Sequence, residues 1–218
     1  MDKRFAIFDM DGTLVDSMVY WQRLGREYLA SRGVTEGVDE VLERIKAMTM
    51  AESSALFIET FGLPGTPETV EAEMNAVMDG HYRADIPLKP GAAHYLAALK
   101  ARGTKMCVAT ATPEPLARAC LKRLGVLEDF AFLLSCDEVA AGKDRPDVFF
   151  EAARRLGSVP AETAAFEDAL FAARTAKDAG FYTVGVYDAS GDGHWNELTA
   201  LSDETVRDWG AAAEMIKT

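Results

Sequence analysis

The sequence predicts an α/β fold, in which helices cover both faces of a parallel β-sheet and give a three-layer core. Short apolar runs recur along the chain, and segments with helical start and stop signals separate most of them. The first run, residues 5–8, consists of apolar residues flanked by charges, which is typical of a strand covered on both faces. Later strand and helix patterns alternate, which indicates parallel strands joined by right-handed crossovers.

An all-helical segment interrupts this pattern after the first strand. Its helices begin at capping residues, and glycines follow two of them. The first predicted helix starts after a cap at Asp16 or Ser17 and runs to about Ser31. The second starts at the capping box of Thr49 and Glu52 and runs to about Phe61, and the third starts at Thr66 and Pro67 and runs to about Arg83. A segment of about 70 residues is long enough for a small second domain.

Pro87 and the pair Pro90–Gly91 return the chain to alternating strands and helices. We expect residues 1–15 and 87–218 to form a Rossmann-like core and residues 16–86 a helical domain inserted into it. The predicted strands are residues 105–109, 132–135, 163–166 and 181–186. The predicted helices, each followed or ended by a glycine, are 92–102, one from Thr112–Glu114 to Gly125, 146–156 and 169–179, with a weaker helical tail after residue 193.

Charge and hydropathy restrict the classes of protein to which the chain can belong. The 218 residues are 49% hydrophobic and 27% charged, as in ordinary globular proteins. No apolar stretch approaches the roughly 18 residues of a membrane span, so we expect no membrane partner. The 23 Lys and Arg residues against 35 Asp and Glu residues give a net charge of -12, which argues against a nucleic-acid partner. The sequence sets no oligomeric state, and a monomer is compatible with it.

The cysteines and the N-terminus predict a cytoplasmic protein. Cys107, Cys120 and Cys136 are odd in number, widely spaced and without a C-x-x-C pair, which is typical of reduced thiols. The N-terminus leads into an apolar run of only four residues, far shorter than the apolar region of a signal peptide.

Asp9 and Asp11 follow the first strand, at the edge of the sheet where ligands collect in this architecture. Two carboxylates one residue apart repel each other unless a cation lies between them, and hard oxygen ligands favour magnesium or calcium. An EF-hand calcium loop is excluded, because its sixth and twelfth positions would be Leu14 and Tyr20. A solvated Asp–Gly turn remains an alternative at this point.

Further polar residues follow later strands. Thr110 ends a strand just before a helix, where its hydroxyl and the following N–H groups can hold phosphate oxygens. Lys143 lies in a loop before a helix, and Glu167 and Asp168 form a second acidic pair after a strand. Taken singly, Thr110 also fits an ordinary strand terminus, Lys143 a solvated side chain, and the pair Glu167–Asp168 a helix cap. Their shared position at one edge of one sheet favours a single site.

These residues, in this order, resemble the haloacid-dehalogenase superfamily, in its branch with a helical cap inserted after the first strand, which includes beta-phosphoglucomutase-like phosphatases. The resemblance covers essentially the whole chain. The matching motifs are D-x-D-G-T at Asp9–Thr13, Thr110, Lys143 with Pro146–Asp147, and Phe166–Glu167–Asp168.

The resemblance implies a magnesium-dependent phosphatase that acts on a small phosphorylated metabolite. Asp9 would attack phosphorus and form an aspartyl phosphate, while Asp11 would first protonate the leaving oxygen and then activate water. Mg²⁺ would be held by the side chains of Asp9 and Asp168 and the backbone carbonyl of Asp11, with Glu167 oriented nearby. The residues implied in phosphate binding are Asp9, Gly12, Thr110, Ala111 and Lys143.

The chain departs from the family pattern at several positions. Trp21 stands where mutase members carry a histidine, which disfavours a mutase. Met50, in the segment Lys46–Met50, stands where an arginine often binds a second substrate phosphate. The residue after Lys143 is Asp144 where proline is common, and the loop after the acidic pair reads Ala169–Ala172 where a serine and later a glycine are usual.

Two further questions remain open from the sequence. Tyr20, Trp21, Met48 and Met50 either form an apolar entrance to the site or belong to the core of the cap. The alternatives to a phosphatase are a phosphoryl mutase of the beta-phosphoglucomutase type and a catalytically silent phosphate-binding regulatory protein. Dehalogenation is disfavoured, because dehalogenase relatives lack the second aspartate that Asp11 supplies.

Overall fold

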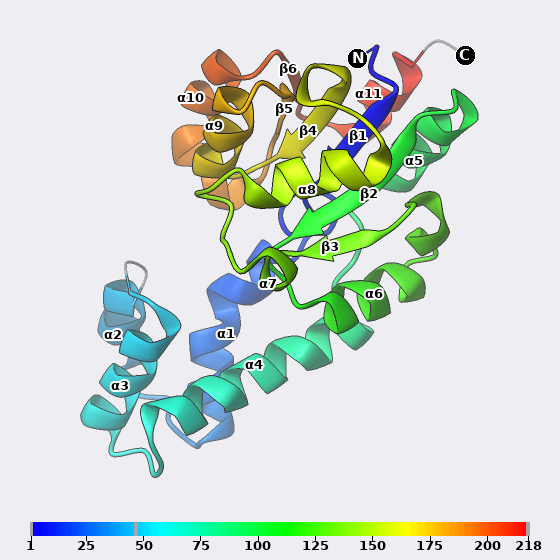
Figure 1. Ribbon diagram of the computed structural model, residues 1–218. Helices are drawn as coiled ribbons and strands as arrows, with labels where there is room; N and C mark the ends of the chain where they lie inside the picture. The colour runs from blue at the N-terminus through cyan, green and yellow to red at the C-terminus, as the bar shows by residue number, and fades with distance from the viewer. Residues whose placement is uncertain (1, 46–47, 217–218) are drawn as a thin grey trace. The chain divides into compact units, whose positions relative to one another are not determined.

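The computed structural model describes residues 2–45 and 48–216. They form two compact units (Figure 1). The core unit comprises the chain up to Met18 and from Ile86 onward, and the helical unit comprises Val19–Asp85.

The core unit contains a parallel sheet with strand order β3-β2-β1-β4-β5-β6. Its strands are β1 (Phe5–Phe8), β2 (Lys105–Thr110), β3 (Leu133–Ser135), β4 (Thr163–Glu167), β5 (Tyr182–Val186) and β6 (Glu204–Val206). Every residue of β1 is buried, because the strand is central and helices cover both faces. The α/β fold expected from the sequence is confirmed.

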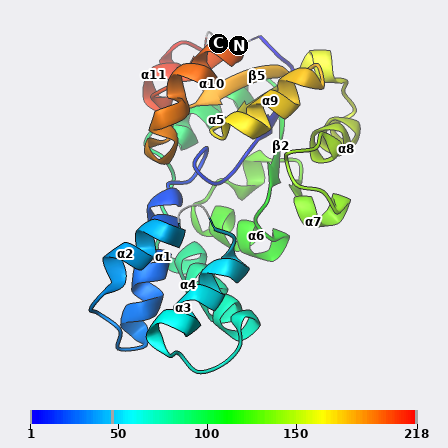
Figure 2. The same ribbon diagram turned by 90° about the vertical axis from the view of Figure 1, so that its left-hand side faces the viewer.

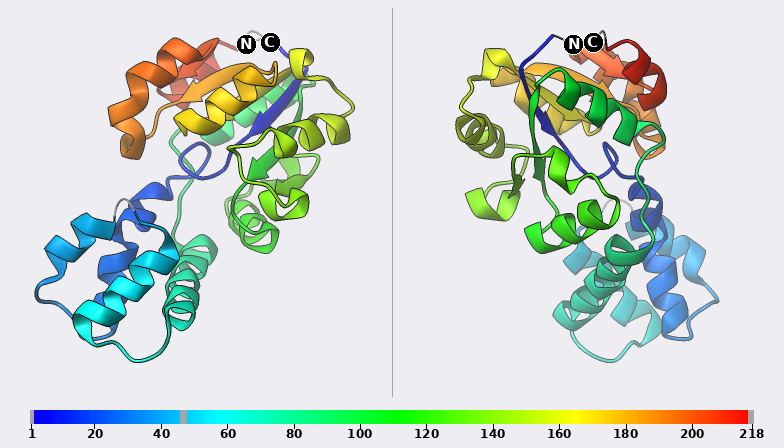
Figure 3. Two further views of the ribbon diagram at one scale, coloured as in Figure 1. Left: turned by 60° about the vertical axis from the view of Figure 1, so that its left-hand side comes forward. Right: turned by 90° about the vertical axis from the view of Figure 1, so that its right-hand side faces the viewer.

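Helices lie on both sides of this sheet (Figure 3, where α9 in gold stands in front on the left and α5 in green stands in front on the right). On one side, α8 and α9 bury Phe149, Ala152 and Ala172 against Ile7 and Cys107 of the sheet. The helices of the core unit are α5 (Ala92–Ala101), α6 (Glu114–Arg123), α7 (Cys136–Val139), α8 (Asp147–Leu156), α9 (Leu170–Asp178), α10 (Trp195–Leu201) and α11 (Trp209–Glu214), with short 3-10 turns at Leu127–Asp129, Pro160–Glu162 and Ala189–His194.

Aromatic rings fill the space between the opposite face and helices α5 and α11. Phe8 and Phe166 stack with ring centroids 4.2 Å apart, and Tyr95 of α5 lies 4.8 Å from Trp209 of α11. Trp209 also approaches Phe166 at 5.9 Å. Burial of such rings contributes a large apolar area, so this cluster stabilises the neighbouring ends of β1 and β4.

The described residues of the helical unit form four helices, which Figure 2 also shows. They are α1 (Met18–Ser31), α2 (Val38–Ile45), α3 (Met50–Phe61) and α4 (Pro67–Ala84). Tyr28 of α1 stacks near Phe57 of α3 and donates a 2.7 Å hydrogen bond to Glu73 of α4. Within the described part of the chain, no helix combines the length and the apolar character needed to cross a membrane.

Local signals explain where two of these helices begin. Glu52 N–H donates to the Thr49 hydroxyl at 3.2 Å, and Thr49 N–H donates to the Glu52 carboxylate at 2.8 Å, so the capping box is confirmed. Thr66 likewise caps α4 ahead of Pro67. The expected cap at Ser17 is wrong, because the buried Ser17 hydroxyl has no hydrogen-bond partner among the described residues.

The sequence patterns missed α2, α7 and β6. Helices α2 and α7 have eight and four residues, too few to show a helical period. Strand β6 has three residues, of which only Val206 is buried, and it lies at the edge of the sheet. Short edge strands of this kind carry little apolar alternation, so pairing with β5 decides their conformation.

The two segments that join the units are paired side by side within the core unit. Val15 forms an antiparallel bridge with Leu88, and Asp16 N–H donates to the Pro87 carbonyl at 3.0 Å. Lys89 N–H donates to the Leu14 carbonyl at 2.9 Å. The outgoing segment is thus fixed to the returning one.

His81 joins two parts of the helical unit through its imidazole ring. Its Nδ1 lies 2.8 Å from the Asp85 carboxylate, and its Nε2 lies 2.9 Å from the Glu27 carboxylate of α1. Burial alone would lower the pKa of His81, but the two carboxylates together raise it above its usual value. The ring is therefore stabilised in its charged form, with both nitrogens donating.

Substitution His81→Gln is expected to destabilise the protein in a pH-dependent way. Because the folded-state pKa of His81 is raised, its contribution is fully present below the unfolded value of about 6.5 and is lost as pH rises through the folded value. The difference in Tm between wild type and variant should be larger near pH 6 than near pH 8.5. His94→Gln, an exposed histidine in the core unit, is the control. A difference in Tm that does not change with pH would contradict the assignment.

Candidate active site

Strand register fixes Asp9 at the carboxyl edge of the sheet. Phe8 pairs with Val108 of β2 and with Phe166 of β4. The Asp9 N–H continues the β1–β4 pairing by donating to the Phe166 carbonyl at 3.0 Å. Asp9 therefore lies beside Glu167, the last residue of β4.

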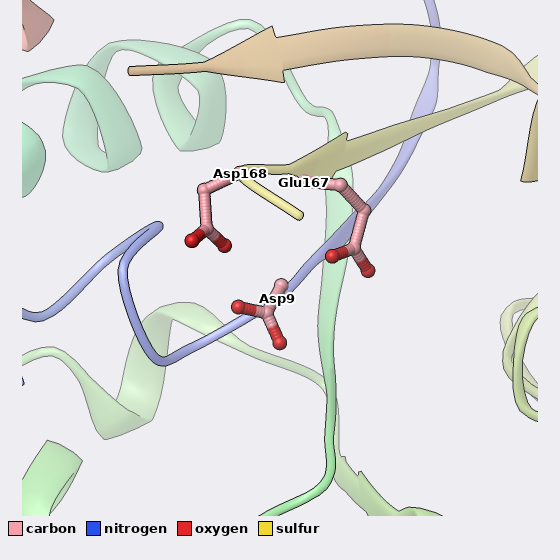
Figure 4. Close-up of side chains that lie close together, drawn as sticks. All are labelled: Asp9, Glu167 and Asp168. Carbon is pink, nitrogen blue, oxygen red and sulfur yellow. The ribbon is translucent and has the colours of Figure 1, made fainter. Parts of the chain in front are cut away.

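Three carboxylates meet at this edge (Figure 4). Asp9, Glu167 and Asp168 each offer an oxygen, and these oxygens lie within 4.8 Å of one another. Asp9 and Glu167 are buried, at 7% and 2% exposure, and Asp168 is half-buried. Glu167 and Asp168 come from one strand end and Asp9 from the neighbouring strand, so the sheet itself assembles the cluster.

Lys143 balances part of this charge. It lies in the loop between α7 and α8, yet its side chain is only 6% exposed. Its ammonium donates to Oδ1 of Asp9 and, at 2.7 Å, to Oε1 of Glu167. The sequence alternative of a solvated lysine is therefore wrong, and so is that of Glu167 as a helix cap, because α9 begins after Ala169 without a side-chain cap.

The pKa values in the cluster reflect burial and mutual repulsion. Burial raises the pKa of Asp9 and of Glu167, and although Lys143 opposes this shift, both stay above their usual values. Burial and the negative charge of Asp9 raise the pKa of Asp168 to about 7. Burial would lower the pKa of Lys143, but Asp9 and Glu167 together raise it, so the lysine stays charged.

A tight loop follows Asp9 and closes on itself. Leu14 and Val15 N–H groups both donate to the Met10 carbonyl, at 2.9 and 3.0 Å, and Gly12 N–H donates to the Val15 carbonyl at 3.0 Å. Gly12 has φ +77, and a Cβ there would stand 2.3 Å from Oδ2 of Asp168. The loop thus requires glycine, and the close approach that the structure shows is to the Asp168 carboxylate.

Thr13 connects this loop to Asp168 and to the C-terminal part of the chain. Its hydroxyl donates to Oδ1 of Asp168 at 3.0 Å, and its carbonyl accepts a hydrogen bond from Nε1 of Trp209 at 3.1 Å. Trp209 is a supporting residue that sequence reasoning missed. A tryptophan in a helical tail carries no local signal for a contact 196 positions away.

The Asp11 carboxylate lies outside the cluster of three. Its Oδ2 accepts a 2.7 Å hydrogen bond from the Thr112 hydroxyl, and Thr112 N–H donates to the Thr110 hydroxyl at 3.0 Å. The helix predicted to start at Thr112–Glu114 is confirmed as α6, which begins at Glu114 after Pro113 and has no side-chain cap. The position of Thr112, two residues after Thr110, was the available signal for a role in the site.

The remaining predicted site residues are sequence neighbours of Thr110 and Lys143 in the core unit or belong to the helical unit. Ala111 is an exposed residue directly after Thr110, and Asp144 is an exposed neighbour of Lys143. In the helical unit, Trp21 donates through Nε1 to the Tyr82 hydroxyl at 3.2 Å. Met50 is the first residue of α3, while Lys46 and Ala47 of the same predicted segment lie outside the described residues.

The donor chemistry of the cluster fits a divalent cation such as Mg²⁺. Carboxylate oxygens are hard ligands, and the three carboxylates outnumber the single ammonium group that contacts them. Their raised pKa values show that the fully ionised cluster is under-compensated, which a bound cation corrects. The Asp11 backbone carbonyl stays a predicted fourth ligand.

The chain is similar to known proteins over most of its length. The model of the haloacid dehalogenase-like hydrolase family matches residues 4–180. The chain is 31% identical to a beta-phosphoglucomutase of Bacillus subtilis, over 83% of this chain and 82% of the relative. It is 27% identical to a phosphorylated carbohydrates phosphatase of Thermotoga maritima, over 86% and 87% of the two chains.

Solved structures share the fold. A crystal structure from Thermotoga maritima matches with a TM-score of 0.83 at 24% identity, over 98% of this chain and 100% of that one. A variant of CbbY from Rhodobacter sphaeroides, in complex with xylulose-(1,5)bisphosphate, matches with a TM-score of 0.73 at 24% identity and 95% coverage of both chains. Because the family model matches most of the chain, and a relative above 30% identity covers most of it as well, the protein is an enzyme of the haloacid dehalogenase-like hydrolase family.

Proposed function

We propose that the protein is a magnesium-dependent phosphatase that hydrolyses a small phosphomonoester, such as a sugar phosphate, through an aspartyl phosphate on Asp9. The observation that carries this proposal is the buried Asp9 carboxylate, which is held by Lys143 beside Glu167 and Asp168 at the carboxyl edge of the sheet. Relatives named as a beta-phosphoglucomutase and a phosphorylated carbohydrates phosphatase support the choice of a sugar phosphate.

In the first step, the Asp9 carboxylate attacks phosphorus and the bond from phosphorus to the alcohol oxygen breaks. Asp11 gives its proton to that oxygen. The ammonium of Lys143 lies against Asp9 and offsets negative charge on the transferring phosphoryl group. The Thr110 hydroxyl and the Ala111 N–H hold phosphoryl oxygens, and Thr112 orients the Asp11 carboxyl.

In the second step, Asp11 takes a proton from water as that water attacks phosphorus, which releases phosphate and restores Asp9. Magnesium, held by Asp9, Asp168 and the Asp11 carbonyl with Glu167 nearby, would supply positive charge to the phosphoryl oxygens. Residues 16–86 would serve as a cap domain on the core formed by residues 1–15 and 87–218, and would exclude bulk water during transfer.

A phosphoryl mutase is the second candidate, because a 31% identical relative is named a beta-phosphoglucomutase. Trp21 argues against it, since it occupies the place of the mutase histidine and its Nε1 is bonded to Tyr82. Incubation with a hexose 1-phosphate and a trace of the bisphosphate separates the two functions. Free phosphate indicates a phosphatase, and isomerised hexose phosphate indicates a mutase.

Asp9→Asn is expected to abolish turnover. Across a panel of phosphorylated metabolites, wild type should release phosphate in a magnesium-dependent manner, and the variant should lose roughly 10⁴-fold or more in kcat, because an amide is a poor nucleophile. Asp144→Asn makes the same chemical change at an exposed residue next to Lys143, and should keep activity within about 2-fold. Magnesium-dependent turnover that survives in Asp9→Asn would show that another group attacks phosphorus.

Gly12→Ala is expected to displace the Asp168 side chain, because the new Cβ would overlap its Oδ2. Magnesium half-saturation should rise about 10- to 100-fold, as is typical when support of a metal ligand is lost. Gly103→Ala is the matched control: φ is +78 there, but no atom lies within 4 Å of the added Cβ. If both substitutions raised the magnesium concentration for half-saturation equally, backbone strain alone would explain the effect of Gly12→Ala.

Magnesium affinity is expected to increase with pH. The pKa of Asp168 is raised to about 7, so below this pH the carboxyl holds a proton that must leave before a cation binds. Between pH 6 and pH 7 the apparent Kd should fall by about 5-fold, and calorimetry in buffers of different ionisation enthalpy should detect proton release. A pH-independent Kd without proton release would refute Asp168 as a ligand.

A further inference from the structure

A second ion pair lies in the core unit, between the half-buried Lys89 of the returning segment and the buried Asp188 of the loop after β5. The Lys89 ammonium lies 2.6 Å from Oδ2 of Asp188, with side-chain exposures of 13% and 4%. Lys89 also donates to the Tyr187 carbonyl at 3.1 Å. The other carboxylate oxygen of Asp188 accepts hydrogen bonds from the Ser190 N–H, at 2.8 Å, and from the Ser190 hydroxyl.

These partners keep Asp188 ionised. Burial alone would raise the pKa of Asp188, but Lys89 and Ser190 together lower it. A buried ion pair adds little net stability compared with a well-packed apolar pair, because both charges lose their hydration. Its value here is better explained by the geometry that it fixes.

Lys89 is connected to the loop that carries Asp11. Its backbone N–H donates to the Leu14 carbonyl, and the preceding Leu88 bridges Val15. Leu14 and Val15 close the tight loop through their hydrogen bonds to Met10. Movement of residues 87–89 is therefore transmitted to residues 11–15 through backbone hydrogen bonds.

Asp188 is connected to the strand end that carries Asp168. It follows β5, which pairs with β4 up to the register of Gly185 with Glu167. A Cβ on Gly191, in the same loop, would stand 3.9 Å from the Asp168 carbonyl. Trp209, which bonds the Thr13 carbonyl, lines the same hollow of about 310 Å³ as Lys89 and Asp188.

We infer that Lys89 and Asp188 are positioning residues, whose ion pair fixes the returning segment against the loop after β5 and thereby holds the Asp11 loop in place for proton transfer to the leaving group. Neither side chain touches the reacting atoms. The inference rests on the proposed phosphatase reaction, because it is the proton transfer by Asp11 that requires this precision.

Leaving-group dependence follows from this role. An alkoxide needs a proton to leave, whereas p-nitrophenolate is stable enough to leave without one. Loss of the ion pair should therefore lower kcat for glycerol phosphate by about 10-fold, because general acid catalysis supplies about 10²–10⁴-fold and only part of it is lost. The kcat for p-nitrophenyl phosphate should change by less than about 2-fold.

The test compares wild type with Lys89→Met, which removes the charge and leaves an unbranched side chain one atom shorter. Lys89→Arg should restore much of the kcat for glycerol phosphate. Lys177→Met is the matched control, because Lys177 pairs with Asp203, which bonds Thr183 near the opposite end of β5. Asp188→Asn keeps the shape that Ser190 binds and replaces Lys89→Met if that variant fails to fold.

Hydrogen exchange of the metal-free proteins gives a readout independent of turnover. Peptides covering residues 10–17 and 86–91 should exchange faster in Lys89→Met than in wild type, and should be unchanged in Lys177→Met. Equal loss of kcat for both substrates, or unchanged exchange in these peptides, would overturn the inference. If wild type hydrolyses neither ester, the exchange experiment alone decides whether the ion pair holds the Asp11 loop. The proposed function itself fails only if wild type releases phosphate from no phosphorylated metabolite of the panel.

Discussion

The site depends on the interaction of Lys143 with Asp9 and Glu167. The parallel register of β1 and β4 forces two carboxylates together at a buried strand edge, where an uncompensated charge is costly. Lys143 enters from a loop outside the sheet and donates to both. This contact lets the acidic side chains remain in the interior, and it determines how much negative charge is left for a cation.

The same interaction reconciles an acidic protein with an anionic substrate. With a net charge of -12, the long-range field of the chain repels phosphate esters. Binding must therefore come from groups within contact distance, where screening by water is weak. A charged lysine and a cation-binding carboxylate cluster concentrate attraction at the point of reaction, so recognition is local.

Much of the fold and part of the site could be predicted from the sequence, because both depend on short-range patterns. Asp9 follows an apolar strand, Thr49 and Glu52 have capping-box spacing, and each signal acts within a few residues. Lys143 was assigned to the site because its motif resembles that of a known family, whereas nothing in the sequence indicated the contact of Trp209. The contacts of these two residues span 134 and 196 positions and arise from sheet order and helix packing, which no local pattern encodes. Strand β6 was missed for the related reason that its pairing partner defines it.

Asp9 and Asp11 are two residues apart but are held by different parts of the chain, and this separation suits the different tasks that we propose for them. Asp9 is fixed by β4 through its backbone and by Lys143 through its side chain. Asp11 is bonded to Thr112 and lies on a loop whose far end is paired with the segment returning from the helical unit. A nucleophile and a group that gives and later takes a proton both need a defined position, and separate supports hold each of them independently of the other. Because Asp11 is supported by Thr112 and its loop by the paired segments 14–16 and 87–89, its position is set without disturbing Asp9.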